Sequence, residues 1–162
     1  MFNKDVMWSS ASSEWETPQD LFDELDRIFH FDLDPCATPT NAKCELFFTK
    51  EDDGLRQNWG GHRVFMNPPY GHQIKKWVRK AYLESLKPNT VVVCLLPART
   101  DTQWFHEYCA KGKVWFIKGR LKFGGSKNSA PFPSMVVIFG DTELDVPGGK
   151  RHEQKTLEEV VG

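Results

Sequence analysis

The feature that most constrains the fold is an unbroken apolar run over residues 91–96. A strand buried on both faces has this continuous pattern, whereas a strand with one solvated face alternates apolar and polar residues. Burial on both faces requires covering layers on both sides of a sheet. Because strand and helix patterns alternate along the rest of the chain, we expect an α/β fold: a Rossmann-like, doubly wound, mainly parallel sheet.

The remaining elements follow from residue periodicity. Apolar residues at helical spacing predict helices over 18–29, 73–86 and 101–110. Strands are predicted over 31–34, 46–48, 64–66, 114–117 and 135–139. The last strand follows a long loop rather than a crossover helix, so we expect it to be antiparallel. Thr17 is predicted to cap the first helix, with Pro18 at its first position.

The 162 residues suffice for one domain with a sizeable core. We expect a mobile amino-terminal arm over 1–14, a catalytic domain over 15–140 and a carboxy-terminal tail over 141–162. No run approaches the length of a membrane span and the chain does not start with a signal-peptide pattern, which favours a cytoplasmic protein. The cysteines form no CxxC pair and have no histidine at zinc spacing, so reduced thiols without a metal are expected.

Charge is divided unevenly along the chain. Residues 1–60 hold 5 Lys/Arg and 13 Asp/Glu, a net charge of −8, whereas residues 72–127 hold 12 and 3, a net charge of +9. The basic part includes a long Gly-rich loop over 118–127. Two interpretations remain open: a surface that contacts nucleic-acid phosphates, or solvated helices that are unevenly placed.

The sequence Asn67-Pro68-Pro69-Tyr70 follows the predicted strand 64–66. Open α/β sheets place their ligands at the carboxyl ends of strands. Pro68 disfavours helical geometry at Asn67, and each proline has a carbonyl acceptor but no N–H donor. The motif is therefore a rigid pair of acceptors beside an aromatic ring. Asp34 also ends a predicted strand.

Five motifs occur in a fixed order: Trp-x-Thr-Pro at 15–18, Asp-Pro-Cys-Ala at 34–37, Glu-Asp-Asp-Gly-Leu at 51–55, Asn-Pro-Pro-Tyr-Gly at 67–71 and Gly-Arg-Leu-Lys-Phe at 119–123. The chain resembles S-adenosylmethionine-dependent amino-methyltransferases. More closely, it is similar to the phage DNA adenine-N6 methyltransferase family over roughly residues 15–140. The resemblance implies methyl transfer from S-adenosylmethionine to the exocyclic amine of adenine in DNA, in a host cytoplasm, without a metal.

The resemblance also implies roles for the motif residues. The Asn67 side chain and the Pro68 carbonyl would accept hydrogen bonds from the amine, with Pro69 completing the turn and Tyr70 stacking on a flipped or single-stranded adenine. The cofactor residues would be Thr17, Pro18, Asp34, Pro35, Cys36, Ala37 and Asp53. The DNA residues would be Arg99, Arg120, Lys122 and Phe123.

Some of these assignments have a structural alternative. Phe123 either forms a second aromatic wall around the base or fills the core. The segment after Asp34 departs from related cofactor loops, because it contains no glycine until Gly54. Other activities also stay open: methylation of cytosine N4 or of a protein glutamine, or a DNA-binding module that has lost catalysis.

Overall fold

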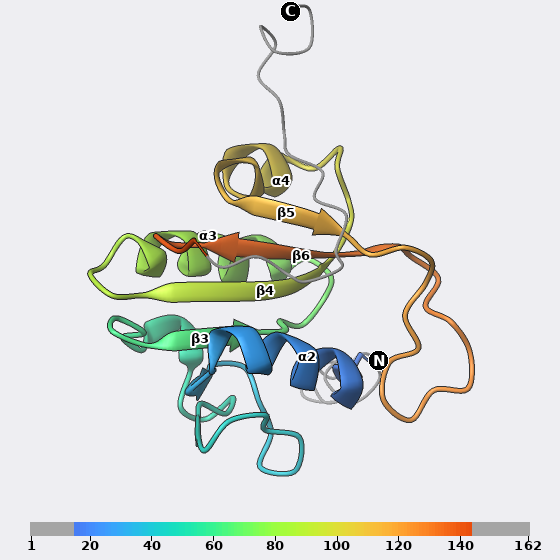
Figure 1. Ribbon diagram of the computed structural model, residues 1–162, viewed down its shortest axis with the longest axis horizontal. Helices are drawn as coiled ribbons and strands as arrows, with labels where there is room; N and C mark the ends of the chain where they lie inside the picture. The colour runs from blue at the N-terminus through green and yellow to red at the C-terminus, as the bar shows by residue number, and fades with distance from the viewer. Residues whose placement is uncertain (1–14, 144–162) are drawn as a thin grey trace, which may run out of the picture.

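The computed structural model describes residues 15–143, which form a six-stranded sheet with helices on both faces (Figure 1). The strand order is β2-β1-β3-β4-β6-β5. The strands are β1 (Leu33–Asp34), β2 (Leu46–Phe47), β3 (Arg63–Met66), β4 (Val91–Pro97), β5 (Lys113–Phe116) and β6 (Ser134–Phe139). The helices are α2 (Gln19–Phe29), α3 (Ile74–Ser85) and α4 (Gln103–Glu107), with 3-10 turns η1 (Gly54–Arg56) and η2 (Cys109–Lys111).

The pairing of the strands confirms the predicted topology. Strands β2, β1, β3 and β4 are mutually parallel, and β6 is antiparallel to both β4 and β5. The last strand is thus inserted between two strands of the other direction. The predicted fold class, a mainly parallel α/β sheet with an antiparallel last strand, is confirmed.

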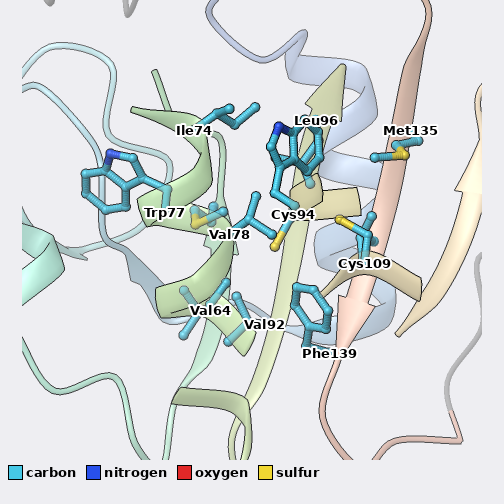
Figure 2. Close-up of a cluster of buried hydrophobic side chains, with 14 of the residues drawn as sticks. Val64, Ile74, Trp77, Val78, Val92, Cys94, Leu96, Cys109, Met135 and Phe139 are labelled. Atoms are coloured by element: carbon cyan, nitrogen blue, oxygen red, sulfur yellow. The ribbon is translucent and has the colours of Figure 1, made fainter. Parts of the chain in front are cut away.

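Strand β4 lies near the centre of the sheet, and all of its residues are buried. Successive side chains of a strand point to opposite faces, so β4 contributes to two cores. Val92, Cys94 and Leu96 face α3 (Figure 2), whereas Val93 and Leu95 lie in the cluster that contains α2. The apolar run therefore predicted the burial of this strand on both faces correctly.

Two helix predictions need correction. Thr17 does not cap α2: the helix begins at Gln19 after Pro18, and no side chain makes the cap hydrogen bond. The Thr17 hydroxyl instead accepts a hydrogen bond from Asn67, a tertiary contact that competes with capping. The helix predicted over 101–110 is also shorter, because α4 ends at Glu107 and the chain continues as the turn η2.

The parallel strands bring the distant motifs to one edge of the sheet. Asp34 is the last residue of β1, Asn67 directly follows β3, and Arg99 lies just beyond β4. Strand β5 runs in the same direction, so the loop that leaves it at residue 117 also starts from this edge. The edge formed by the carboxyl ends therefore carries the candidate site.

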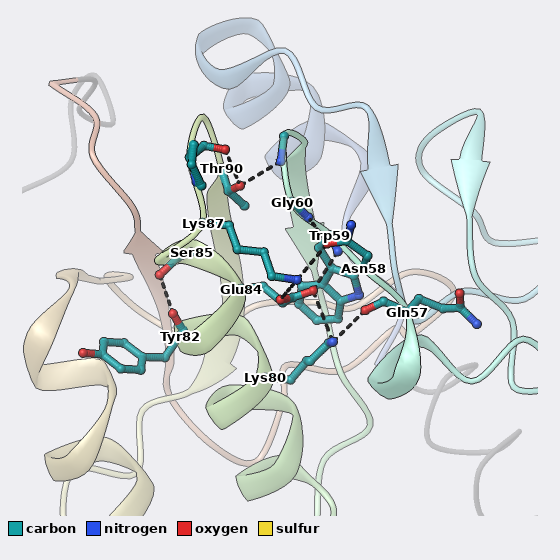
Figure 3. Close-up of polar contacts among 12 residues, drawn as sticks. Gln57, Asn58, Trp59, Gly60, Lys80, Tyr82, Glu84, Ser85, Lys87 and Thr90 are labelled. Carbon is teal, nitrogen blue, oxygen red and sulfur yellow. Dashed lines mark hydrogen bonds and ion pairs between the residues drawn. The ribbon is translucent and has the colours of Figure 1, made fainter.

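A buried ionic network attaches α3 to the loop before β3 (Figure 3). Glu84 accepts hydrogen bonds from the Trp59 backbone N–H at 2.7 Å and pairs with Lys80 at 3.2 Å and with Lys87. Lys80 also donates to the Gln57 carbonyl at 2.6 Å. Burial disfavours the charged carboxylate, yet these hydrogen bonds outweigh burial and lower the pKa of Glu84.

The predicted arm over 1–14 and most of the predicted tail, residues 144–162, lie outside the described residues. The limits of the catalytic domain at 15 and 140 therefore stay a prediction. None of the helices in the described part is long and apolar enough to cross a membrane. Within residues 15–143 there is no cluster of three or more His, Cys, Asp or Glu side chains that could hold a metal ion.

Replacing Glu84 by alanine should lower the free energy of unfolding by about 1–3 kcal/mol, because it leaves the buried Trp59 N–H without its acceptor. A carboxyl with a lowered pKa stabilises the fold above its unfolded-state pKa and loses this effect as the pH falls through its folded-state pKa. The difference between wild type and variant should therefore shrink in acid. Urea denaturation at neutral and acidic pH measures both effects, with the exposed Glu24→Ala on α2 as control. Equal stability of the two Glu variants would contradict the assigned role.

Candidate active site

Asn67 follows β3, and its side-chain amide is held by two contacts. Nδ2 donates to the Trp15 backbone carbonyl at 2.7 Å and to the Thr17 hydroxyl at 2.9 Å. A carbonyl can only accept, so these contacts fix which end of the amide is the nitrogen. The Oδ1 atom is buried and has no hydrogen-bond partner among residues 15–143. A buried acceptor without a donor costs free energy, so this atom is suited to a ligand that donates a hydrogen bond.

A cleft opens beside Asn67 at the ends of β1 and β3. Its walls come from the segment before α2, the loop after β1 and the motif after β3. The lining residues are Trp15, Glu16, Thr17, Asp34, Cys36, Asn41, Lys43, Phe65, Asn67 and Pro68. The structure thus brings together predicted residues of three separate motifs.

Asp34 presents a buried carboxylate to this cleft. Its oxygens accept hydrogen bonds from the backbone N–H groups of Cys36 at 3.3 Å and Lys43 at 3.1 Å. Burial dominates over these hydrogen bonds and raises the pKa of Asp34 to about 6. A positively charged ligand in the cleft would favour the ionised form.

In the loop after Asp34, hydrogen bonds between Thr38 and Asn41 stabilise the turn, and no glycine is present in it. The Asn41 side-chain oxygen accepts from the Thr38 N–H at 2.6 Å, and the Asn41 N–H points back to the Thr38 carbonyl at 3.3 Å. The close backbone approach occurs at Gly54, where a Cβ atom would lie 2.0 Å from the Pro35 carbonyl oxygen. Gly54, about twenty residues after Asp34, therefore allows the close packing of backbone against this loop, although the loop itself contains no glycine.

Sequence reasoning missed two charged residues that line the cleft, Lys43 and Glu16. The Lys43 side chain is only 10% exposed, and its ammonium lies 2.7 Å from the Gln19 amide oxygen and 3.9 Å from a Glu16 carboxylate oxygen. Lys43 is one of few basic residues in the acidic part of the chain, and this was the available signal. The cleft thus offers both a buried cation and the buried Asp34 carboxyl.

Tyr70 lies in a cluster of four aromatic rings. Its hydroxyl donates to the Leu95 carbonyl at 3.2 Å, and its ring is nearly parallel to that of Trp15. Phe123 and Phe132 stand edge-on to both rings. Phe123 is only 1% exposed, so the described conformation uses it as a core residue. Its contact with a base stays a prediction.

The other predicted residues lie at or near this edge. Pro35 and Ala37 are buried in the loop after β1, and Pro69 is buried beside Pro68. Asp53 has a positive φ of 56° and pairs with Arg56 at 3.4 Å, next to Gly54. Neither Asp53 nor Pro18 lines the cleft.

The predicted DNA-binding cations are exposed. Arg99 follows β4, and Arg120 and Lys122 lie in the long loop. Arg120 donates to the Ala130 carbonyl at 3.4 Å, which connects the two arms of this loop. Arg99 is close enough to Tyr70 for its charge to act on the phenol. The binding of these three cations to phosphate stays a prediction.

Comparison with known proteins finds relatives over most of the chain. A family model described as DNA N-6-adenine-methyltransferase (Dam) matches residues 7–151. The DNA N-6-adenine-methyltransferase of Haemophilus phage HP1 is 33% identical over 149 residues, which cover 86% of this chain and 85% of that protein. The protein of the same name from Escherichia phage T1 is 37% identical over 141 residues, covering 85% of this chain and 58% of its own length.

The raised pKa of Asp34 predicts an unusual pH dependence of stability. The ordinary pKa of 3.8 applies to the unfolded chain, so the folded protein retains this proton up to about pH 6. Ionisation should then lower the free energy of unfolding as the pH rises from about 4 to 6, by up to about 3 kcal/mol. The Asp34→Asn variant cannot ionise, so its stability relative to wild type should rise over this interval. A difference that is independent of pH in urea denaturation would contradict this.

Proposed function

The chain belongs to the DNA N-6-adenine-methyltransferase family, and we propose that it transfers the methyl group of S-adenosylmethionine to adenine N6 through the site at Asn67. It is an adenine-specific DNA methyltransferase by this membership, while the cofactor and the roles of individual residues are our proposal. The relatives named above are phage proteins, and we place the reaction in a host cytoplasm.

The observation that supports this role of the site is the buried Oδ1 atom of Asn67. An exocyclic amine donates two hydrogen bonds, and Oδ1 is an acceptor that no donor among residues 15–143 reaches at the end of β3. The amide cannot rotate to offer its nitrogen instead without losing the contact with the Trp15 carbonyl. Asn67 is thus preorganised to accept and not to donate.

Two acceptors at this place address the chemical difficulty of the reaction. The lone pair of the adenine amine is delocalised into the ring, which makes the nitrogen a poor nucleophile. Hydrogen bonds from the amine to Asn67 Oδ1 and to the Pro68 carbonyl favour a pyramidal nitrogen with a localised lone pair. Because these bonds strengthen as the nitrogen becomes positive, they stabilise the transition state more than the ground state. As the new N–C bond forms, the methyl–sulfur bond would break, and the nitrogen would then release one proton to water.

The cleft beside Asn67 fits the polar groups of S-adenosylmethionine. When bound, this cofactor supplies an electrophilic methyl group on a sulfonium. The buried carboxylate of Asp34 would attract its cationic groups, and Lys43 would pair with its carboxylate near the start of α2. Thr17 would hold both the methionine end and, through its hydroxyl, the Asn67 amide. Asp53 is retained as an acceptor for the cofactor adenine.

The DNA would approach the same edge from the side of the long loop. An adenine stacked in a duplex cannot reach Asn67, so it must be flipped out or come from a single strand. The exposed cations Arg99, Arg120 and Lys122 would bind phosphates around the extruded nucleotide. These contacts would orient the nucleic acid without reading its sequence.

Asn67→Ala should lower the rate of methyl transfer by about 10²–10³-fold, because it removes an acceptor that acts in the transition state. The assay incubates unmethylated DNA with labelled S-adenosylmethionine, digests it to nucleosides and measures N6-methyladenine. Asn58→Ala, in the loop before β3, is the matched control and should keep wild-type activity. Calorimetry with S-adenosylmethionine should show a loss of cofactor affinity much smaller than the loss of turnover, since the variant also lacks the contacts to Trp15 and Thr17.

The same experiment tests the alternatives. Absence of methyladenine in the wild-type reaction, with active controls, would overturn the proposed function, and methylcytosine would point to another amino group. A wild-type protein that binds DNA but gives no heat with S-adenosylmethionine would be a binding module. If Asn67→Ala lost cofactor affinity as strongly as turnover, its role would be in the cofactor site instead.

The affinity for S-adenosylmethionine should rise between about pH 5 and pH 7, by up to tenfold per pH unit below the pKa of Asp34. The reason is that the pKa of about 6 leaves the free carboxyl protonated in acid, and cofactor binding would favour the carboxylate. Calorimetric titrations across this range measure the effect. Asp34→Asn should bind more weakly and without this dependence, and an unchanged pH profile in that variant would rule out Asp34 as the responsible group.

A further inference from the structure

We propose that Trp15 forms the second aromatic wall of the base-binding site, so that the target adenine stacks between Trp15 and Tyr70. The inference deepens the proposed function and rests on it, because it assumes an extruded adenine as substrate. Sequence reasoning had considered only Phe123 for this wall. The arrangement of the four rings favours Trp15.

The rings of Trp15 and Tyr70 lie in nearly parallel planes, which is the orientation that two walls of a stacking site require. The planes of Trp15 and Tyr70 are 17° apart, and their centroids are separated by 6.5 Å. Stacked bases follow one another at about 3.4 Å, so two rings that enclose a base are about 6.8 Å apart. The observed centroid separation of the two rings is close to this value.

The two phenylalanines have a different orientation. Phe132 makes angles of 69° with Trp15 and 72° with Tyr70, and Phe123 makes angles of 76° and 86° with the same rings. Neither ring can offer its face to a base that is parallel to Tyr70. Phe123 and Phe132 are thus placed to border the site at its sides and to support its walls.

Backbone contacts fix Trp15 relative to the catalytic amide. Its carbonyl accepts the hydrogen bond from Asn67 Nδ2 at 2.7 Å, and Asn67 is three residues before Tyr70. Asn67 therefore connects the two proposed walls: it contacts Trp15 through this hydrogen bond, and Tyr70 follows it in the same motif. Because this contact uses the Trp15 backbone, a substitution of the side chain leaves it in place and tests the ring alone.

The long basic loop is attached to the same segment. The Gly124 N–H donates to the Glu16 carbonyl at 2.8 Å, directly beside Trp15. Phe123, which precedes this glycine, contacts the Trp15 ring at a centroid distance of 5.4 Å. The loop that carries Arg120 and Lys122 thus contacts the segment that carries the proposed wall.

The experiment compares Trp15→Leu and Trp15→Phe with the wild type. A duplex containing the adenine that the wild type methylates is the substrate, at saturating S-adenosylmethionine. Loss of base stacking in the leucine variant should lower kcat/KM for DNA about 5- to 150-fold, whereas phenylalanine should restore most of it. Trp115→Phe, a buried tryptophan of β5 in the same core, is the control for folding and should retain wild-type kinetics.

Two binding measurements make the test specific. Because Trp15 also lines the cofactor cleft, calorimetry with S-adenosylmethionine is run on each variant, and the loss of kcat/KM for DNA should exceed any loss of cofactor affinity. A duplex with 2-aminopurine at the target position should fluoresce more strongly when bound to Trp15→Leu than to wild type, because an aromatic wall quenches the stacked base. Unchanged kcat/KM and fluorescence in that variant, or a defect confined to cofactor affinity, would overturn the proposal for Trp15. Failure of the wild type to methylate adenine would instead overturn the proposed function.

Discussion

The candidate site depends on the two hydrogen bonds donated by the Asn67 amide nitrogen. They join the end of a central strand to the segment just before α2, about fifty residues earlier in the chain. In doing so they fix the orientation of the amide, hold Trp15 and Thr17 at the cleft, and leave the amide oxygen buried without a partner in the described part of the chain. One contact thus couples the proposed cofactor cleft to the proposed base site, because Thr17 belongs to the former and Trp15 to both.

The sheet provides the rigid support that this arrangement requires. Strands β3 and β4 are parallel and completely or largely buried, so the ends of both strands are held by two cores and by the ladder between them. The prolines of the motif then extend this rigidity beyond β3. By contrast, β1 and β2 are short and are connected by a loop that relies on Asn41, Thr38 and the close approach of Gly54 to Pro35. The proposed cofactor cleft is built on this less regular side.

The charges at the site agree with two different ligands. Asp34 and Lys43 are largely buried in the cleft and can each meet an opposite charge of a zwitterionic cofactor. Arg99, Arg120 and Lys122 are exposed, so phosphates bound by them would be screened by solvent and held without exact geometry. Glu84, remote from this edge, satisfies its charge within the protein and serves the fold. The burial of a charged side chain and the partners that it contacts, more than its residue type, thus distinguish the charges proposed to bind ligands from those that stabilise the fold.

The sequence by itself determined the fold class, the strand ends that carry Asp34 and Asn67, and the family, because periodicity and ordered motifs are local properties of the chain. It also identified the loop over 118–127 and the antiparallel last strand from the lack of a crossover helix. Only the tertiary structure decided the role of the Thr17 hydroxyl and the burial of Lys43. It also decided that Gly54 packs against the loop after Asp34, and whether Trp15 or Phe123 is oriented as a wall parallel to Tyr70. Each of these depends on which distant groups meet in space, and hydrogen-bond partners, desolvation and ring orientation are set by that meeting rather than by spacing along the chain.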